Sequence, residues 1–257
     1  MKKIVIIGVC LLIAVALVFI TPSVFAPTPD DTGNSVPMMP VSTAPDHYEI
    51  LHNENFAYIL TTPKNATENM PLIVYLHGSG YSGSNPEILL LYDGFPRALT
   101  LGELPNIPAY VLIPQLPAQF NGWEHVKAEL MALIDSVVTS CKINNDKICL
   151  TGYSMGATGA WKLAATYPDR FSCLVPISGT IAKVSSNLNA LQAMPIWAFA
   201  SKADTIVSPA YTTDFIDALK ATNPNCKATL LETAEHTATW NVYKSTEYNI
   251  FQWMLAQ

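Results

Sequence analysis

The feature that most constrains this chain is the pentapeptide Gly152-Tyr153-Ser154-Met155-Gly156, which has the pattern G-x-S-x-G. Residues 147–151 before it are mostly apolar and typical of a buried strand, whereas residues 157–167 after it favour a helix that Pro168 would end. A strand that turns directly into a helix leaves room only for glycine on either side of the serine. We therefore predict that Ser154 is a nucleophile, exposed at the end of a strand.

The composition fits one large folded domain. The 257 residues are 50% hydrophobic and only 13% charged, which is enough apolar material for a sizeable core. The formal net charge is −6, and no basic run occurs beyond the N-terminus. We therefore do not expect a nucleic acid as a partner.

The N-terminal residues 1–26 have the pattern of a targeting segment. Lys2 and Lys3 precede an uncharged apolar run over residues 4–20, and Val24-Phe25-Ala26 has the small-residue spacing of a cleavage site. The run is also nearly long enough to span a bilayer, so residues 1–26 are either a signal peptide or an N-terminal membrane anchor. In both cases the rest of the chain is expected to be exported, with the membrane as a partner only through such an anchor.

The remaining chain divides into a linker and a catalytic domain. Residues 27–45 contain five prolines and are predicted to be a Pro-rich linker, which leaves residues 46–257 for the catalytic domain. In that domain apolar runs alternate with helical patterns, after an antiparallel hairpin at residues 48–60. The predicted later strands are 72–76, 110–113, 147–151, 173–177, 196–200 and 228–231, and the predicted helices are 124–140, 155–167, 213–222 and 245–256. This alternation predicts an α/β fold with a doubly wound, mostly parallel sheet.

A serine hydroxyl needs a base and an orienting acid to act as a nucleophile. Nucleophiles at turns of this kind are followed along the chain first by the acid and then by the histidine. His236 is the only histidine after Ser154. Asp204 closely follows the strand predicted at 196–200, whereas Asp214 and Asp217 fall within a predicted helix. We therefore predict a catalytic triad of Ser154, Asp204 and His236.

The negative oxygen of a tetrahedral intermediate needs fixed N–H donors. One candidate is the backbone N–H of Met155, directly after the nucleophile. The other is the N–H of Ser79, with Gly80 as the alternative, in the loop His77-Gly78-Ser79-Gly80 that follows an early strand. His77 itself is expected to hold this loop in place. Trp123 and Trp240 are candidates for lining the substrate cleft, although either one could equally belong to the core.

The sequence offers no metal or cofactor site. His47, His52 and His125 lack ligand spacing with Cys, Asp or Glu, and no phosphate-binding or dinucleotide-binding loop is present. Four cysteines follow the N-terminal segment, and two of them fall in predicted core strands, which favours free thiols over disulfides.

Taken together, these motifs resemble the α/β-hydrolase serine carboxylesterases and predicted peptidases, close to secreted bacterial feruloyl and polyhydroxyalkanoate-depolymerase-type esterases. The resemblance covers about residues 47–257. It rests on the peptides 75–80, 113–115, 151–156, 167–171, 176–179, 196–199 and 252–255, together with Trp123, Trp161, Asp204, His236 and Trp240. It departs at Ala157, where a second glycine often follows the turn, and at Ala200-Ser201, where a His-Gly pair is common. The resemblance implies an α/β-hydrolase fold in a single domain.

We expect an exported serine carboxylesterase that acts through an acyl-enzyme on Ser154. Its substrates are expected to be short-chain or aryl esters, including hydroxycinnamoyl esters, on a small molecule or a polysaccharide. The interval from Gly179 to Met194 is too short and too polar for a large lid over the site. The alternatives are a serine peptidase of the same fold or, less well supported by the intact triad, a non-catalytic binding module.

Overall fold

The computed structural model describes residue 45, residues 47–181 and residues 188–257. The described residues all belong to the second of the two units of the chain, residues 41–257. The predicted targeting segment 1–26 and nearly all of the predicted linker lie outside the described residues. None of the described helices is long and apolar enough to cross a membrane.

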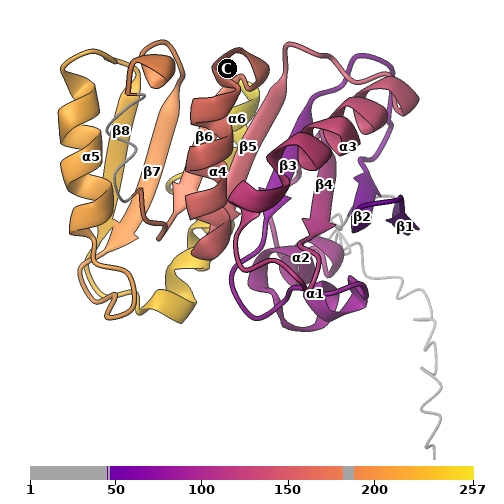
Figure 1. The fold of residues 1–257 in the computed structure, drawn as a ribbon, viewed down its shortest axis with the longest axis horizontal. Helices are drawn as coiled ribbons and strands as arrows, with labels where there is room; N and C mark the ends of the chain where they lie inside the picture. The colour runs from indigo at the N-terminus through magenta and orange to yellow at the C-terminus, as the bar shows by residue number, and fades with distance from the viewer. Residues whose placement is uncertain (1–44, 46, 182–187) are drawn as a thin grey trace, which may run out of the picture. The chain divides into compact units, whose positions relative to one another are not determined.

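The core of the second unit is one eight-stranded sheet with the order β1-β2-β4-β3-β5-β6-β7-β8 (Figure 1). The strands are β1 (His47–His52), β2 (Ala57–Thr62), β3 (Leu72–Leu76), β4 (Tyr110–Gln115), β5 (Ile148–Tyr153), β6 (Cys173–Ile177), β7 (Ile196–Ser201) and β8 (Cys226–Leu231). The pairs β1–β2 and β2–β4 are antiparallel, and every later pair is parallel. Since parallel strands end at the same edge, the loops after β3, β5 and β7 are brought together at one edge of the sheet.

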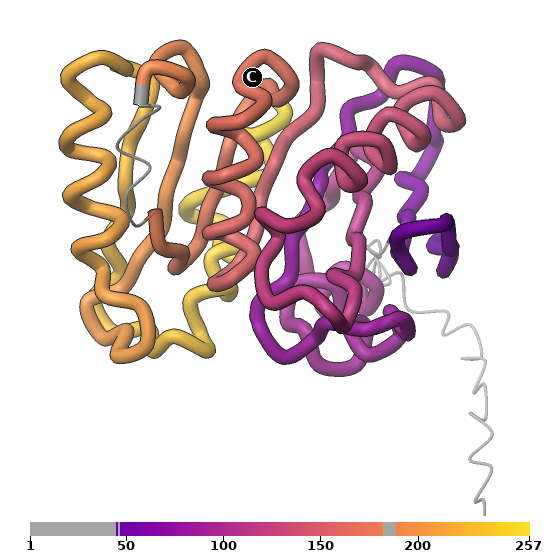
Figure 2. The backbone as a smooth tube through the Cα atoms, viewed as in Figure 1, coloured from indigo at the N-terminus to yellow at the C-terminus, as the bar shows by residue number. Residues whose placement is uncertain are grey.

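Helices cover both faces of the sheet, as the backbone trace shows (Figure 2). The α-helices are α1 (Glu87–Tyr92), α2 (Gly94–Thr100), α3 (Lys127–Ser140), α4 (Met155–Thr166), α5 (Ala210–Lys220) and α6 (Ile250–Leu255). The 3-10 helices are η1 (Trp123–Val126), η2 (Pro168–Arg170), η3 (Leu188–Leu191) and η4 (His236–Lys244). The fold is therefore the predicted doubly wound α/β fold, in a single domain.

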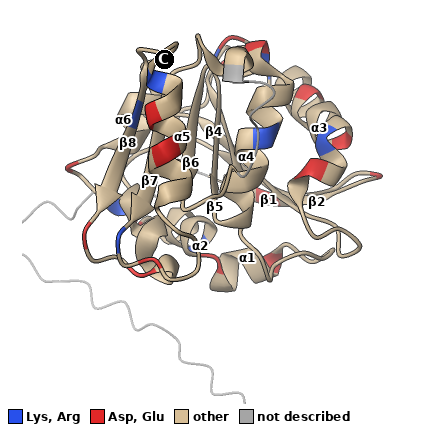
Figure 3. Cartoon of the chain, turned by 60° about the vertical axis from the view of Figure 1, so that its left-hand side comes forward, with Lys and Arg blue, Asp and Glu red and all other residues tan. Residues whose placement is uncertain are grey.

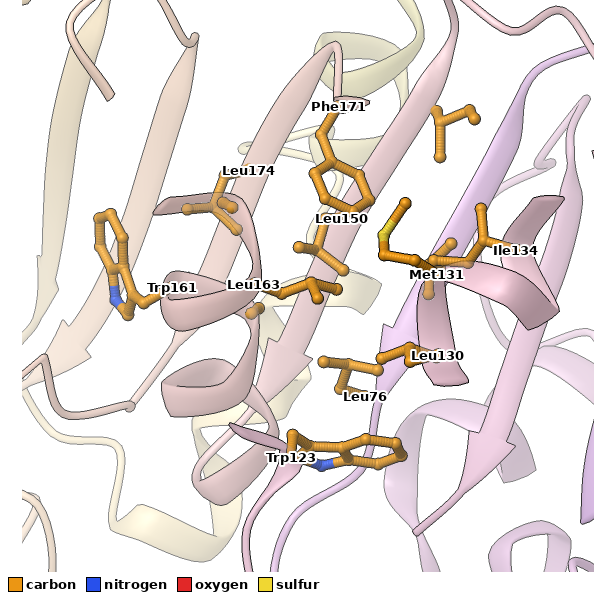
Figure 4. Close-up of a cluster of buried hydrophobic side chains, with 14 of the residues drawn as sticks. Leu76, Trp123, Leu130, Met131, Ile134, Leu150, Trp161, Leu163, Phe171 and Leu174 are labelled. Carbon is orange, nitrogen blue, oxygen red and sulfur yellow. The ribbon is translucent and has the colours of Figure 1, made fainter. Parts of the chain in front are cut away.

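Side chains of β3 alternate between two hydrophobic clusters, which is the period-2 pattern of a strand buried on both faces. Leu72, Val74 and Leu76 pack with residues of α3, α4 and α5, and Figure 4 shows part of that cluster around Leu76 and Trp123. Ile73 and Tyr75 pack on the other face with residues of α1, α2, η4 and α6. The central strands are thus fully covered, and the catalytic loops project from a rigid base.

Most charged residues lie at the surface, with both signs on α3 and on α5 (Figure 3), whereas Asp93 and Asp204 are buried. The four cysteines of the described chain are all free thiols, and Cys149, Cys173 and Cys226 are buried. This agrees with the expectation drawn from their position in core strands.

The helices differ from the sequence prediction mainly around the loops. The short helices α1 and α2, between β3 and β4, were not predicted. The pattern predicted as a helix over 245–256 begins only at Ile250, because Asn249 adopts a left-handed conformation with φ 46°. Residues 245–249 form a turn instead. It follows η4, of which His236 is the first residue.

Candidate active site

Ser154 lies at a sharp turn between β5 and α4. Its backbone has φ 55° and ψ −118°, a conformation that residues with a side chain rarely adopt. A Cβ atom on Gly152 would lie 2.6 Å from the carbonyl group of Gly156. A Cβ atom on Gly156 would lie only 1.9 Å from the carbonyl oxygen of Leu76, at the end of β3. Both glycines are therefore required by close backbone approach, as the G-x-S-x-G pattern predicts.

The structure brings Ser154, His236 and Asp204 into one continuous hydrogen-bonded chain. The Oγ of Ser154 is 2.9 Å from Nε2 of His236. On the other side of the imidazole ring, Nδ1 is 2.7 Å from Oδ2 of Asp204. The three residues come from the ends of β5 and β7 and from the start of η4, so the topology of the sheet assembles them at one edge.

The loop after β7 fixes the orientation of the Asp204 carboxylate. Its Oδ1 accepts hydrogen bonds from the backbone N–H groups of Ile206, at 2.9 Å, and Val207, at 2.8 Å. Burial favours the neutral acid, but these N–H donors and the contact with His236 outweigh it and hold the pKa of Asp204 below its usual value. An ionised Asp204 accepts a hydrogen bond from Nδ1–H of His236, and this tautomer leaves Nε2 free to take the proton of Ser154.

The loop after β3 is held from the core. His77 is fully buried, and its Nε2 accepts the backbone N–H of Leu116 at 3.0 Å, while its Nδ1 donates to the carbonyl oxygen of Gly78 at 2.7 Å. Burial lowers the pKa of His77 to about 4, so the ring is neutral near pH 7 and can make both bonds. His77 thus holds this loop, which is the structural role expected of it.

The two predicted oxyanion donors, Met155 and Ser79, belong to two segments that pack against each other. Met155 is the first residue of α4, so its backbone N–H has no acceptor within the helix. Ser79 is exposed in the loop that His77 holds. The close packing of Gly156 against the carbonyl oxygen of Leu76 brings the start of α4 directly against that loop.

The two tryptophans have different surroundings. Trp123 is only 1% exposed, and its Nε1 donates to the carbonyl oxygen of His77 at 3.1 Å. It packs against α4 at Gly159, where a Cβ atom would lie 2.4 Å from the Cβ of Trp123. Trp123 therefore belongs to the core beneath residues 77–80, which we call the oxyanion loop. The prediction that Trp123 lines the cleft is wrong. Trp240 is half-buried and packs against Gly94 at the start of α2.

Sequence reasoning missed one residue of the site, Tyr153. Its hydroxyl donates a hydrogen bond to the backbone carbonyl oxygen of His236 at 2.8 Å. The sequence could have indicated it, because Tyr153 is an aromatic residue with a hydroxyl group and directly precedes the nucleophile at the end of a strand. In the part of the chain that the structure describes, no three His, Cys, Asp or Glu side chains lie close enough together to hold a metal ion.

The sequence also matches a known protein family. Residues 115–249, more than half of the chain, match the dienelactone hydrolase family. This chain belongs to the dienelactone hydrolase family. The matched region contains Ser154, Asp204 and His236, whereas the loop with Ser79 precedes it.

Curated relatives of this dienelactone hydrolase family member include two iron(III) enterobactin esterases of Escherichia coli, from strain K12 and strain CFT073. Each is 27% identical over 143 residues, which is 51% of this chain and 34% of the relative. The chain therefore spans about a third of the length of the curated relatives that it matches.

Solved structures with the same fold include several esterases. A thermostable esterase superposes with a TM-score of 0.65 at 22% identity, over 79% of this chain and 59% of the other. A ferulic acid esterase gives 0.60 at 14% identity, over 82% and 97%. The feruloyl esterase module of Clostridium thermocellum, complexed with sinapinate, gives 0.59 at 17% identity, over 86% and 92%. At these identities the likeness establishes the α/β-hydrolase fold.

Proposed function

We propose that this protein is an exported serine carboxylesterase that hydrolyses short-chain or aryl esters through an acyl-enzyme on Ser154. The observation that carries the proposal is the unbroken path from Ser154 Oγ through His236 to the Asp204 carboxylate, at 2.9 and 2.7 Å. A binding module would need none of these contacts, and a buried acid paired with a largely buried histidine is costly to keep without a use for it.

The geometry supports a two-step reaction. In the first step Ser154 Oγ attacks the ester carbonyl carbon while Nε2 of His236 takes the hydroxyl proton. The N–H groups of Met155 and Ser79 would stabilise the oxyanion. His236 then returns the proton to the departing alcohol, which leaves the acyl group on Ser154. In the second step a water molecule, deprotonated by His236, releases the carboxylic acid and restores the serine.

The substrate preference follows from how open the site is. Between the end of β6 at Ile177 and the start of β7 at Ile196, the described residues contain only the short helix η3. Residues 182–187 of the predicted lidless interval lie outside the described residues. A site without a large cap favours water-soluble esters over lipid droplets.

A hollow beside the oxyanion loop offers space for the alcohol part of the ester. It is lined by Ser82, Gly83, Ser84, Asn85, Glu87, Ile88, Leu91 and Gln115. The strand register places Leu112 of β4 level with Leu150 of β5, because both pair with Val74 of β3. Gln115 is therefore level with Tyr153 and two strands away, about 10 Å from the nucleophile. The mixed lining suits an aryl group or a sugar of a polysaccharide.

The names of the relatives agree with this substrate class. Two of the structures with the same fold are named as ferulic acid or feruloyl esterases, and the curated relatives are named as esterases. We extend the proposal to hydroxycinnamoyl esters on that basis.

The proposal of export rests on residues 1–26, and N-terminal sequencing of the mature protein tests it. A start at Pro27 means cleavage, and an intact Met1 means anchoring. Finding the active protein in the cytosol refutes export.

The test of the reaction is to label the wild-type protein and Ser154→Ala with a fluorophosphonate and to assay both on p-nitrophenyl acetate. We expect the variant to lose labelling and at least about 10⁴-fold in kcat, whereas the remote Ser140→Ala keeps both. Faster cleavage of a peptide anilide than of the ester would favour a peptidase. Preference for long-chain triglycerides over acetyl, butyryl or hydroxycinnamoyl esters would refute the lidless site.

A further inference from the structure

Tyr153 is the last residue of β5 and directly precedes the nucleophile. Its hydroxyl reaches across 83 positions of sequence to the backbone carbonyl oxygen of His236, at 2.8 Å. Thr239 donates to the same carbonyl at 2.9 Å, but it belongs to η4 and moves together with His236. The bond from Tyr153 is different, because it joins the carbonyl group of the histidine itself to the residue directly before Ser154. The other link between η4 and β5 in the described structure, from Tyr243 to Thr151, lies at the far end of η4.

The ring of Tyr153 makes two further contacts within the site. It lies beside the imidazole of His236, with ring centroids 5.3 Å apart and planes tilted by 34°. It also lies against the oxyanion loop at Gly78, where an added Cβ atom would be only 3.2 Å from the Tyr153 ring. One side chain therefore touches the histidine and the oxyanion loop, and its own backbone leads into the nucleophile.

We propose that Tyr153 is a positioning residue that holds His236 and the oxyanion loop in register with Ser154. The proposal rests on the proposed esterase function, since it concerns the alignment of that triad. The distance between Ser154 Oγ and His236 Nε2 depends on where η4 begins, and η4 follows exposed loop residues at 232 and 233. Without the tie from Tyr153 at this first residue of η4, the base is free to shift by the fraction of an ångström that matters for proton transfer.

The chemistry of the phenol suits this role. Burial, reinforced by the negative charges of Asp204 and Asp93, raises the pKa of Tyr153 well above its usual value. The hydroxyl therefore keeps its proton near neutral pH, and it remains a hydrogen-bond donor to the backbone carbonyl of His236. Tyr153 takes no part in bond making. It acts only through the position of the residues that do.

The test compares Tyr153→Phe, which removes only the hydroxyl, with Tyr153→Leu, which also removes the ring. We expect Tyr153→Phe to lower kcat on p-nitrophenyl acetate about tenfold with KM unchanged, and Tyr153→Leu to lower it about a hundredfold. These are the changes expected when one hydrogen bond and then a packed ring stop holding the base. The rate of fluorophosphonate labelling at Ser154 should fall by the same factors, measured on the folded fraction.

The matched control is Tyr243→Phe. Tyr243 is also a buried tyrosine, and its hydroxyl lies 2.5 Å from Thr151 Oγ1, so it links the far end of η4 to β5. The substitution Tyr243→Phe removes this link but leaves the start of η4 in place, so it should lower the melting temperature while leaving kcat unchanged.

The proposal is overturned if Tyr153→Phe lowers kcat no more than Tyr243→Phe does. It is also overturned if KM rises at constant kcat, because Tyr153 would then contact substrate. These results are distinguishable from failure of the esterase function, in which the wild-type protein itself is neither labelled nor active.

Discussion

The two sides of Ser154 are held in place in different ways. On the oxyanion side, the loop after β3 is fixed by His77, which is 0% exposed and bonded at both ring nitrogens, and by Trp123 beneath it. On the base side, Asp204 is fixed by the backbone of its own loop, where Ile206 is 72% exposed. The first side is an extension of the core, whereas the second joins the loop after β7 to the start of η4 by a hydrogen bond.

This difference separates what each side contributes. A change on the oxyanion side disturbs buried groups, so it should appear first in the free energy of unfolding. A change on the base side breaks contacts that matter only when a proton moves, so it should appear first in kcat. Three predictions test this separation.

The largest effect is expected from Asp204→Asn, on the base side. The new amide presents an N–H to Nδ1 of His236, which favours the wrong tautomer for taking the proton of Ser154. We expect kcat to fall about 10⁴-fold, while the melting temperature changes little. Matched unfolding curves and initial rates check this. If most activity remains in the purified variant, Asp204 is not the orienting acid.

A smaller effect, on stability, is expected from Gly156→Ala on the oxyanion side. The added Cβ would lie 1.9 Å from the carbonyl oxygen of Leu76, so β3 and α4 must move apart. We expect a loss of about 3 kcal/mol in the free energy of unfolding, measured by urea titration. Gly80→Ala is the control for added volume, since no atom lies within 4 Å of its Cβ position, although its φ of 92° adds some strain. Equal stability of Gly156→Ala and wild type would contradict the close packing.

The smallest effect concerns two buried groups at the end of β3 that titrate in opposite senses. Burial lowers the pKa of His77 to about 4, so the unfolded chain binds more protons between about pH 4 and 6.5, and this contribution to stability rises with pH. Asp93 accepts hydrogen bonds from the Tyr75 hydroxyl at 2.8 and 3.0 Å. Burial raises its pKa to about 7, so its contribution falls as pH rises from about 4 to 7.

Single variants should separate these opposing contributions. Relative to wild type, Asp93→Asn should gain stability as the pH rises from 5 to 6.5, by on the order of 1 kcal/mol per pH unit. His77→Gln should instead lose stability relative to wild type over the same range. Chemical denaturation at several pH values measures both slopes. Parallel curves for all three proteins would mean that neither group is perturbed as the structure indicates.

The sequence predicted the sheet and the order of the triad well, because both depend on local patterns. Buried strands read as apolar runs, and Ser154, Asp204 and His236 follow strand ends in the order that the topology requires. The short helices α1 and α2 escaped prediction, since helices of six and seven residues are too short for a periodic pattern to be distinctive.

Trp123 and Tyr153 show where local patterns fail. A tryptophan after a strand can lie in the cleft or under it, and the deciding partner of Trp123 is Gly159, on a helix more than thirty residues later. The role proposed for Tyr153 depends on its hydrogen bond to a carbonyl group 83 residues away in the sequence. Such pairings depend on how two distant loops pack, and no property of either segment alone contains that information.

The backbone conformation of Ser154 has a cost in stability. A residue held at φ 55° costs the fold on the order of 1–3 kcal/mol. Glycine would relax that strain, so random drift under selection for stability alone would replace the serine. That replacement would stabilise a non-catalytic module, whereas the proposed acyl-enzyme reaction cannot proceed without the serine hydroxyl.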